Sequence, residues 1–208
     1  MSICIVAATS LELQNLPASH KYDVLITGIG TAATTYHLTR KIRQAKPSLL
    51  IQAGIAGSFH HNLPLATPLI VGQDRFADLG VHEQSQWKDV FDMHLENPNT
   101  PPYSNGWLIN PHTKLFRDLP WQQVSAISIH EITTDPQRIQ QYRTKYQPSI
   151  ESMEGAAFHF VCLQENIPFI QLRTISNYIG ERDKARWQMK PAIENLGQAL
   201  QQIISRYT

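Results

Sequence analysis

Short, wholly apolar segments alternate with helical ones along this chain, and this alternation restricts the fold more than any other feature. Strands are predicted at residues 3–8, 22–27, 49–53, 69–71, 124–129 and 169–176, and helices at 32–43, from 135 onward, at 154–164 and at 191–206. Continuously apolar strands between helices are typical of a sheet that is covered on both faces. The sequence therefore predicts an α/β fold with three layers, α/β/α, over a single domain of residues 1–208.

Composition excludes several classes of function. The formal net charge is +1, and the chain lacks a basic face with interleaved aromatic residues, so neither a nucleic-acid nor a membrane partner is expected. No apolar run reaches the roughly twenty residues of a transmembrane helix, and no basic leader precedes the first strand, so a cytoplasmic protein is expected. The nine histidines lack metal-ligand spacing, and we predict no metal and no cofactor. Cys4 and Cys162 lie in apolar runs and are interpreted as buried free thiols.

Two motifs in the C-terminal third contain candidate catalytic residues. The first, Glu151-Ser-Met-Glu-Gly-Ala-Ala157, places Glu154 at the start of a helix. The second, Arg173-Thr-Ile-Ser-Asn177, places an arginine inside an apolar strand and an amide at its end. Together with Glu12, which follows the first strand, they form a set that can activate a water, bind a ribose and hold a purine. We interpret this set as the machinery that cleaves an N-glycosidic bond.

Each of these residues also has a structural interpretation. A glutamate that follows a strand, as Glu12 does, is usually a solvated loop residue. Glu154 is the stronger signal, but it could simply stabilise the first turn of its helix against the helix dipole. A buried arginine needs a partner, so Arg173 could simply form an ion pair with either glutamate. Asn177 could be a turn residue at the end of its strand.

The glycines and one polar segment are less informative. Gly28-Ile-Gly30 and Gly54-Ile-Ala-Gly57 could hold an anion, but tight turns between strand and helix are the preferred interpretation. The segment 87–107 is predicted to be a long surface loop, either a substrate lid or an insertion.

Over nearly its full length the chain resembles the purine nucleoside phosphorylase/nucleosidase superfamily. The resemblance rests on five features: Glu12, the 28–30 turn, Ala53-Gly-Ile-Ala-Gly57, Ser152-Met-Glu154 and Arg173-Thr-Ile-Ser-Asn177. It implies the phosphorylase/hydrolase-like fold, with a mixed, partly barrel-like sheet, and a homodimer or higher homo-oligomer. Within the superfamily the chain is most similar to the futalosine hydrolases of menaquinone biosynthesis, through Val71-Gly-Gln-Asp-Arg-Phe-Ala-Asp-Leu-Gly80 and Ile175-Ser-Asn-Tyr-Ile-Gly-Glu-Arg-Asp183, followed by Trp187.

The resemblance implies a role for each site residue. Glu12 would be the base for water, Glu154 would bind the ribose hydroxyls, Arg173 would help to place the water or Glu12, and Asn177 would stabilise the departing base. Further substrate-binding residues implied by the resemblance are Ile55, Ala56, Gly57, Phe76, Met153, Ser176 and Trp187.

Two departures from related families refine the expected reaction. Methylthioadenosine/S-adenosylhomocysteine nucleosidases carry an aspartate where this chain has Asn177, and an amide favours hypoxanthine over adenine as the leaving base. Phosphorylases carry an arginine and a hydroxyl where this chain has Gln52 and Ile55, so water is favoured over phosphate as the nucleophile.

Several alternatives stay open at this point. The chain could release adenine from methylthioadenosine, S-adenosylhomocysteine or aminofutalosine, could use phosphate, or could bind nucleosides without turnover. Futalosine carries an aromatic carboxylate, which Phe76 or Trp187 could pack against. The cation that pairs with this carboxylate is not decided among Arg75, Arg182, Lys184 and Arg186.

Overall fold

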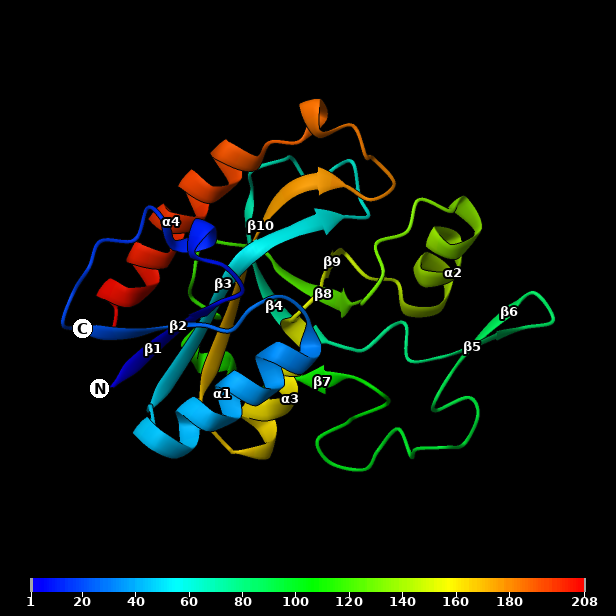
Figure 1. Ribbon diagram of the computed structural model, residues 1–208, viewed down its shortest axis with the longest axis horizontal. Helices are drawn as coiled ribbons and strands as arrows, with labels where there is room; N and C mark the ends of the chain where they lie inside the picture. The colour runs from blue at the N-terminus through cyan, green and yellow to red at the C-terminus, as the bar shows by residue number, and fades with distance from the viewer. Residues whose placement is uncertain (1, 208) are drawn as a thin grey trace.

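The computed structural model describes residues 2–207 and has a mixed central sheet between helices (Figure 1). The strands of this sheet are β1 (Ile3–Ala7), β2 (Tyr22–Ile26), β3 (Leu49–Ser58), β4 (Pro68–Asp74), β7 (Leu108–Ile109), β8 (Gln123–Ser128), β9 (Ile150–Ser152) and β10 (Phe169–Tyr178). The α-helices are α1 (Thr31–Ala45), α2 (Pro136–Tyr146), α3 (Gly155–Gln164) and α4 (Met189–Ser205). A separate hairpin pairs β5 (Gly80–Glu83) with β6 (Gln86–Asp89), and short 3₁₀ turns occur at η1 (Ser10–Leu13), η2 (Thr113–Leu115) and η3 (Lys184–Arg186).

The sheet closes partly on itself. Its strand order is β10-β4-β8-β9-β3-β1-β2, and β10 also pairs with β3, so that β3, β10, β4, β8 and β9 form a ring. Strand β1 runs parallel to both β2 and β3, and β3 runs parallel to β10. By contrast, β4 runs antiparallel to β10, and β9 runs antiparallel to β3. The predicted three-layer α/β fold with a mixed, partly barrel-like sheet is therefore confirmed.

Alternate residues of the central strands face opposite helical layers. Ile3 and Ile5 of β1 belong to the core beneath α4, whereas Cys4 and Val6 belong to the core beneath α1 and α3. In Figure 1, α1 and α3 lie together on one side of the sheet and α4 lies on the other. Because both faces are covered, the strands need apolar side chains in both directions, which explains their uninterrupted apolar sequences.

The two cysteines are buried and free, as the sequence predicts. Both belong to the core between the sheet and the helices α1 and α3. Burial raises the pKa of the Cys4 thiol to about 11, so this thiol stays protonated and packs as an apolar group.

Several elements differ from the sequence prediction. The third strand does not end at Ala53 but continues to Ser58, so Gly54–Gly57 lie inside β3 and do not form the turn that was preferred for them. Gly28 and Gly30 do form the expected turn between β2 and α1. The sequence did not predict the short strands β7 and β9 or the hairpin β5–β6, because segments of two to four residues carry too little periodicity.

The polar segment 87–107 folds around a buried cation. Arg75, just after β4, forms an ion pair with Asp89 of β6 at 3.0 Å. The Arg75 guanidinium also lies 5.8 Å from the Phe91 ring centre and 5.2 Å from that of Trp107. A desolvated cation against aromatic faces is a strong local anchor, and it holds this segment on the body of the protein.

None of the helices within residues 2–207 is both long enough and apolar enough to cross a lipid bilayer.

Candidate active site

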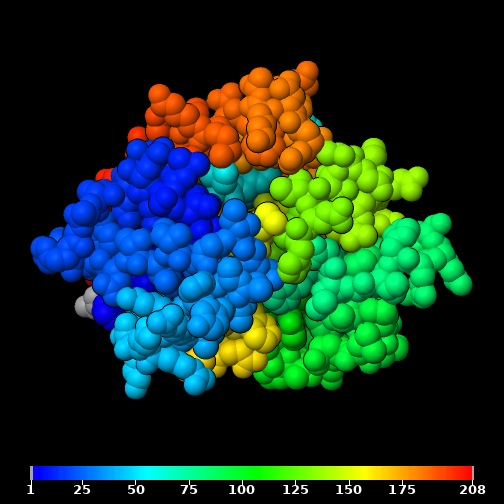
Figure 2. Space-filling model, viewed as in Figure 1, coloured from blue at the N-terminus to red at the C-terminus, as the bar shows by residue number. Residues whose placement is uncertain are grey.

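A pocket of about 300 Å³ opens at the carboxyl ends of β1, β3 and β10. In Figure 2 the yellow chain segment near residue 153 is visible at the centre of the molecule, between the blue N-terminal part, the orange segment above it and the yellow-green segment beside it. The pocket is lined by Ala8, Thr9, Leu11, Glu12, Ile29, Ile55, Ala56, Gly57, Ile129, Ile132, Glu151, Ser152, Met153, Glu154, Ser176, Asn177, Ile179, Gly180, Glu181, Arg182, Trp187, Met189 and Ile193. The topology thus brings together residues from both ends of the chain, from Ala8 to Ile193.

Glu12 is held by backbone donors at both carboxylate oxygens. It lies in η1, directly after β1, where the Thr9 backbone N–H donates to Oε2 at 3.0 Å and the Ile55 N–H donates to Oε1 at 3.2 Å. Only 8% of the residue is exposed, and burial raises the pKa of the carboxyl above its usual range despite the opposing charge of Arg173. A fixed carboxylate of raised pKa at the edge of a pocket is suited to take a proton from water.

Arg173 lies behind the pocket wall, between strands. Its Nη1 donates to the Ile55 carbonyl at 3.4 Å and lies 3.7 Å from Glu154 Oε2. This approach requires glycine at position 54, because a Cβ there would collide with Arg173 Nη1 and would lie 2.8 Å from Glu12 Oε1. The structural ion pair considered from the sequence is therefore present with Glu154, and the charge of Arg173 also lowers the pKa of Glu12 against the effect of burial.

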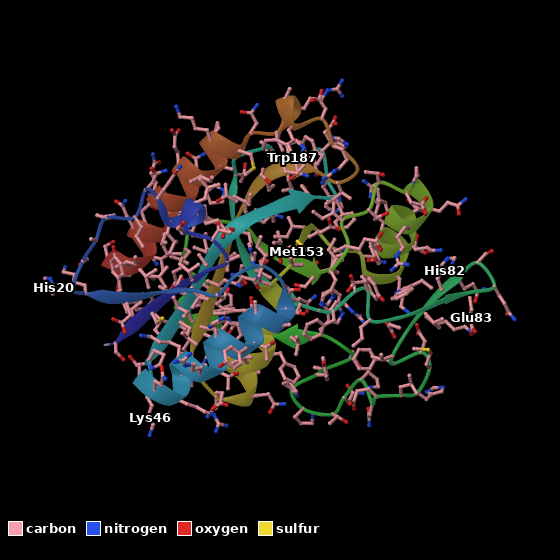
Figure 3. All side chains as sticks on the ribbon, viewed as in Figure 1. His20, Lys46, His82, Glu83, Met153 and Trp187 are labelled. Atoms are coloured by element: carbon pink, nitrogen blue, oxygen red, sulfur yellow. The ribbon has the colours of Figure 1, made fainter. Side chains whose placement is uncertain are left out.

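Glu154 is the N-cap residue of α3. Its Oε1 accepts a hydrogen bond from the Gly30 backbone N–H at 3.0 Å, so the turn after β2 orients it. Its neighbour Met153 lies near the centre of the molecule in Figure 3, at the ends of the central strands. A fixed carboxylate beside a thioether gives a polar and an apolar contact for a sugar ring.

Asn177 lies at the end of β10, and its amide is already oriented. The Ser176 hydroxyl donates to Asn177 Oδ1 at 2.8 Å, and Asn177 Nδ2 donates to the Tyr178 carbonyl at 3.1 Å. An amide nitrogen carries two hydrogens, so one N–H is left for a ligand in the pocket. Ser176 Oγ also lies 3.3 Å from the Ala56 carbonyl oxygen, a longer contact for the same hydroxyl hydrogen, so Ser176 and Asn177 stay close to β3.

The rim of the pocket carries a cation on an aromatic ring. The Arg182 guanidinium lies 5.6 Å from the ring centre of Trp187, whose indole N–H donates to the Glu181 carbonyl at 3.1 Å. Trp187 lies above β10 in Figure 3, near the top of the molecule. Among the residues that line the pocket, Arg182 is the only arginine or lysine.

Phe76 is the one predicted substrate-binding residue that the chain places elsewhere. It lies in a second, wider groove with Tyr36 of α1, Tyr103 and Phe160 of α3. No residue of the segment 87–107, as described, lines the first pocket. His82 and Glu83, at the tip of the neighbouring hairpin, project away from the centre in Figure 3.

One residue of the pocket escaped the sequence analysis. Glu151, on β9, is only 7% exposed, and burial raises the pKa of its carboxyl to about 8. It opens the same motif that contains Glu154, but the short strand β9 was not predicted, so nothing in the sequence indicated that its side chain is buried.

Comparison with protein families gives a match over most of the chain. Residues 18–208 match the family model described as the phosphorylase superfamily. The matched range contains Glu154, Arg173 and Asn177, whereas Glu12 precedes it.

Curated relatives of two kinds are about equally similar. A futalosine hydrolase of Thermus thermophilus is 26% identical over 183 residues, which cover 87% of this chain and 80% of the relative. A 5'-methylthioadenosine/S-adenosylhomocysteine nucleosidase of Bacillus cereus is also 26% identical, over 178 residues that cover 81% of this chain and 73% of the relative.

Solved structures of both kinds share the fold. A 5'-methylthioadenosine/S-adenosylhomocysteine nucleosidase of Helicobacter pylori, solved with butyl-thio-DADMe-Immucillin-A, aligns with a TM-score of 0.80 at 17% identity, covering 99% of this chain and 98% of the other. A futalosine hydrolase of the same organism aligns with a TM-score of 0.79 at 17% identity, covering 99% and 97%.

Proposed function

The chain belongs to the phosphorylase superfamily, and from this premise we propose that it is a nucleosidase that hydrolyses futalosine to hypoxanthine and dehypoxanthinyl futalosine. The proposal has three parts: cleavage of an N-glycosidic bond, water as the nucleophile, and a 6-oxopurine as the leaving base. Each part is supported by different residues of the pocket.

Bond cleavage is supported by the two oriented glutamates. Glu154 binds the ribose hydroxyls, with its own position held by Gly30. Glu12 takes a proton from a water molecule while the oxygen of that water forms a bond to the anomeric carbon. The bond from this carbon to the purine nitrogen breaks. The pair of electrons leaves with the base, whose developing negative charge is stabilised by the free N–H of Asn177.

The charge of the pocket favours water over phosphate. Glu12, Glu154 and Glu181 line it, against the single arginine at the rim. A fourth glutamate, Glu151, adds little charge at pH 7 because burial raises the pKa of its carboxyl to about 8. A phosphate dianion would lie among carboxylates without a charge-assisted donor beneath the sugar. Ile55, which lines this part of the pocket, offers no side-chain hydrogen bond.

The hydrogen bonds of the Asn177 amide are the observation that supports the choice of leaving base. Its Oδ1 already accepts from Ser176, and its unused group is an N–H donor. A 6-oxopurine presents two acceptors on that edge, N7 and O6, whereas a 6-aminopurine places a second donor beside N7. The arrangement therefore supports hypoxanthine as the leaving base.

The rim supports a substrate with an aromatic carboxylate at its 5′ end. Trp187 offers a ring face, and Arg182 offers a cation that takes part in no ion pair within residues 2–207. The other three candidates are less suited: Arg75 is buried against Asp89, Arg186 pairs with Glu181 at 3.0 Å, and Lys184 does not line the pocket. We therefore assign the carboxylate to Arg182.

The main alternative is an adenine-releasing nucleosidase, because the curated relatives of that kind are as similar as the futalosine hydrolase. Such an enzyme would use the same glutamates and differ at the base and the 5′ end.

Assembly and cellular role are part of the same proposal. The groove that contains Phe76 also carries Tyr36 and Leu79, which are 62% and 51% exposed, and we expect a second copy of the chain to cover these side chains. Light scattering coupled to size exclusion should then give the mass of a homodimer. A cytoplasmic role in menaquinone biosynthesis follows from futalosine as substrate.

The first experiment is product analysis with futalosine, with and without phosphate. Hypoxanthine released at the same rate in both buffers supports the proposal. Release only with phosphate would make the enzyme a phosphorylase, and adenine from methylthioadenosine without hypoxanthine from futalosine would favour the alternative.

Arg182→Gln tests the 5′ end in the same assay. We expect KM for futalosine to rise about tenfold or more, with little change for inosine, which lacks the carboxylate. Arg186→Gln is the matched control. An equal rise in KM for both substrates, or a larger effect of Arg186→Gln, would contradict the assignment.

A further inference from the structure

Asp74, at the end of β4, is a fully buried carboxyl group that does not line the pocket. Three donors surround it. Its Oδ1 accepts from the Arg75 backbone N–H at 2.8 Å and from the Ser128 hydroxyl at 3.1 Å, and its Oδ2 accepts from Gln171 Nε2 at 3.2 Å. Burying a carboxyl group is costly, and the proposed reaction has no step for Asp74. The group therefore needs another role.

Ser128 connects Asp74 to the start of α3. Strands β4 and β8 are neighbours in the sheet, and α3 contacts both of them (Figure 1). Ser128 is the last residue of β8, and its hydroxyl donates to Asp74 and accepts from the Ala156 backbone N–H at 2.7 Å. The first N–H groups of a helix have no partner inside the helix, so this bond satisfies a group that would otherwise be unpaired.

Gly155 brings α3 into direct contact with Asp74. A Cβ at this position would lie 2.1 Å from Asp74 Oδ2 and 2.3 Å from Gln171 Nε2, so there is no space for a larger residue. Gly155 is the first residue of α3. The helix therefore begins directly on the hydrogen bond between Asp74 and Gln171.

Glu154 is the residue immediately before this contact, and it is held in two ways. Its carboxylate Oε1 accepts from the Gly30 N–H at 3.0 Å. Its backbone forms the N-cap of α3, next to the turn that Asp74 and Ser128 hold. A shift of this first turn would move Glu154 relative to a bound sugar, even with the bond to Gly30 in place.

We propose that Asp74 is a positioning residue for Glu154, because it fixes the first turn of α3 through Ser128 and through its contact with Gly155. This inference rests on the proposed function, since it takes Glu154 to bind the ribose hydroxyls. Misplacing a substrate-binding group by about 1 Å can cost roughly a hundredfold in rate, so a residue outside the pocket can control activity. Arg173 acts on the carboxylate of Glu154, whereas Asp74 acts on its backbone.

A neutral group can make the hydrogen bonds of Asp74. The ring centre of His159, on α3, lies 4.6 Å from that of Phe169, two residues before Gln171 on β10. His159 Nδ1 donates to the Leu108 carbonyl at 2.9 Å, which makes Nε2 an acceptor. Neither His159 Nε2 nor Gln171 Oε1 has a partner within residues 2–207. A protonated Asp74 would donate to Gln171 Oε1 and turn the amide N–H toward His159, which gives all three side chains a partner.

The charges around Asp74 agree with a neutral form. Burial raises the pKa of its carboxyl to about 7, against the hydrogen bond from Gln171 and the charge of Arg173. Burial also lowers the pKa of His159 to about 4, so this ring is uncharged near pH 7. Asparagine has the shape of aspartate and is always neutral. It should therefore replace Asp74, whereas alanine should not.

The test measures the preference of the enzyme for ribose over 2′-deoxyribose. This preference is the ratio of kcat/KM for inosine to kcat/KM for 2′-deoxyinosine, and it depends on the bond between Glu154 and the 2′-hydroxyl. We expect the ratio to fall about tenfold or more in D74A and to stay within about twofold of the wild type in D74N. S128A removes the link to α3 at the loss of one oxygen, and it should lower the ratio as well.

D89A is the matched control, because Asp89 is also a buried carboxyl group but pairs with Arg75 and Lys145. D74A and D89A should both lower the melting temperature, since each leaves buried donors unpaired, but only D74A should change the ratio. A ratio in D74A and S128A equal to that in D89A would overturn the inference, as would the same loss in D74N as in D74A. If D74A does not fold, the comparison of S128A with D74N decides.

Failure of the proposed function has a different outcome. If the wild type releases adenine from methylthioadenosine but no hypoxanthine from futalosine or inosine, the assigned base is wrong. The ratio is then measured with methylthioadenosine and its 2′-deoxy analogue, and a fall in D74A still supports the role of Asp74. If the wild type cleaves ribosides and 2′-deoxyribosides equally well, the inference falls and the nucleosidase remains. If it cleaves no nucleoside, both fall.

Discussion

Arg173 lies between the two carboxylates on which the proposed chemistry depends. It pairs with Glu154 at 3.7 Å, and its charge opposes the effect of burial on the pKa of Glu12. It also donates to the Ile55 carbonyl, while the N–H of the same residue donates to Glu12. One arginine thus pairs with Glu154 and influences Glu12 through its charge and through Ile55, and it does so from behind the pocket wall, without lining the pocket itself.

Glu12→Gln should separate binding from turnover. The amide keeps the size of the side chain but cannot accept a proton, so we expect kcat to fall about 10²- to 10⁴-fold with KM little changed. Glu83→Gln, the same change at the tip of the distant hairpin, is the matched control (Figure 3). Normal turnover by Glu12→Gln would exclude Glu12 as the base, and binding without turnover by the wild type would identify a module that only binds nucleosides.

Asn177→Asp should shift the preference between bases. A carboxyl group accepts a hydrogen bond from the 6-amino group of adenine and, when it is protonated, donates one to N7. An ionised carboxylate has no donor for the O6 and N7 acceptors of hypoxanthine and repels them. We expect release of hypoxanthine to fall at least about tenfold and the ratio of adenine to hypoxanthine release to rise. Asn166→Asp, an exposed change in the turn after α3, is the control. An unchanged ratio would remove the argument for base selectivity.

At the scale of elements, β3 is the strand on which the site is built. Its first half is buried sheet, and its second half carries two glycines that allow close packing: Gly54 admits Arg173 and Glu12, and Gly57 admits the side chain of Ile179. Strand β10 runs parallel to it and delivers Arg173 and Asn177 to the same edge. A strand rich in small residues beside one rich in functional side chains allows the backbone to serve as the floor of a pocket.

Gly54→Ala tests this arrangement. The added methyl group would collide with the Arg173 guanidinium and approach Glu12, so we expect a loss of about 1–3 kcal/mol in stability together with a fall in kcat. Gly72→Ala on β4 is a matched control, since the nearest atom to its Cβ is 3.9 Å away. Melting temperature and turnover are measured for both. If Gly54→Ala has the same melting temperature and turnover as Gly72→Ala, the close approach of Arg173 to Gly54 does not matter for stability or activity.

Strands β3 and β10 show which parts of the fold and the site could be predicted from the sequence. The apolar run of β10 and its flanking Arg173 and Asn177 follow from residue type and position along one strand. Glu151 and the extension of β3 could not be predicted in the same way, because both depend on pairing with strands distant in sequence. Strand β9 has three residues, and its burial follows from its place between β3 and β8.

For the whole molecule, buried carboxyl groups predict how stability changes with pH. Burial raises the pKa of Asp74 to about 7 and that of Glu151 to about 8, so the folded chain holds protons that the unfolded chain releases near pH 4. Their contribution is complete below pH 4 and is lost as pH rises through 7 and 8. Buried His159, with its pKa lowered to about 4, acts in the opposite direction, but only up to about pH 6.5.

The melting temperature should therefore fall between pH 6.5 and 8.5. In E151Q the fall should be smaller, because one of the two groups no longer titrates, whereas Glu83→Gln should follow the wild type. A melting temperature that rises over this range, or an identical slope in E151Q, would contradict the assignment of the raised pKa values.

The place of β10 in the sheet has a consequence for how the protein is made. This strand lies between β3 and β4, which precede it by about a hundred residues and do not pair with each other. While β10 is still being synthesised or lies inside the ribosome, β3 and β4 each have an edge without a partner strand. Unpaired strand edges can pair with other chains, so this stage of synthesis is prone to aggregation. Insertion of β10 closes the ring and at the same moment delivers Arg173 to Glu12 and Glu154. We therefore expect enzymatic activity to appear only after β10 has joined the sheet, so that activity measures completion of the ring of strands.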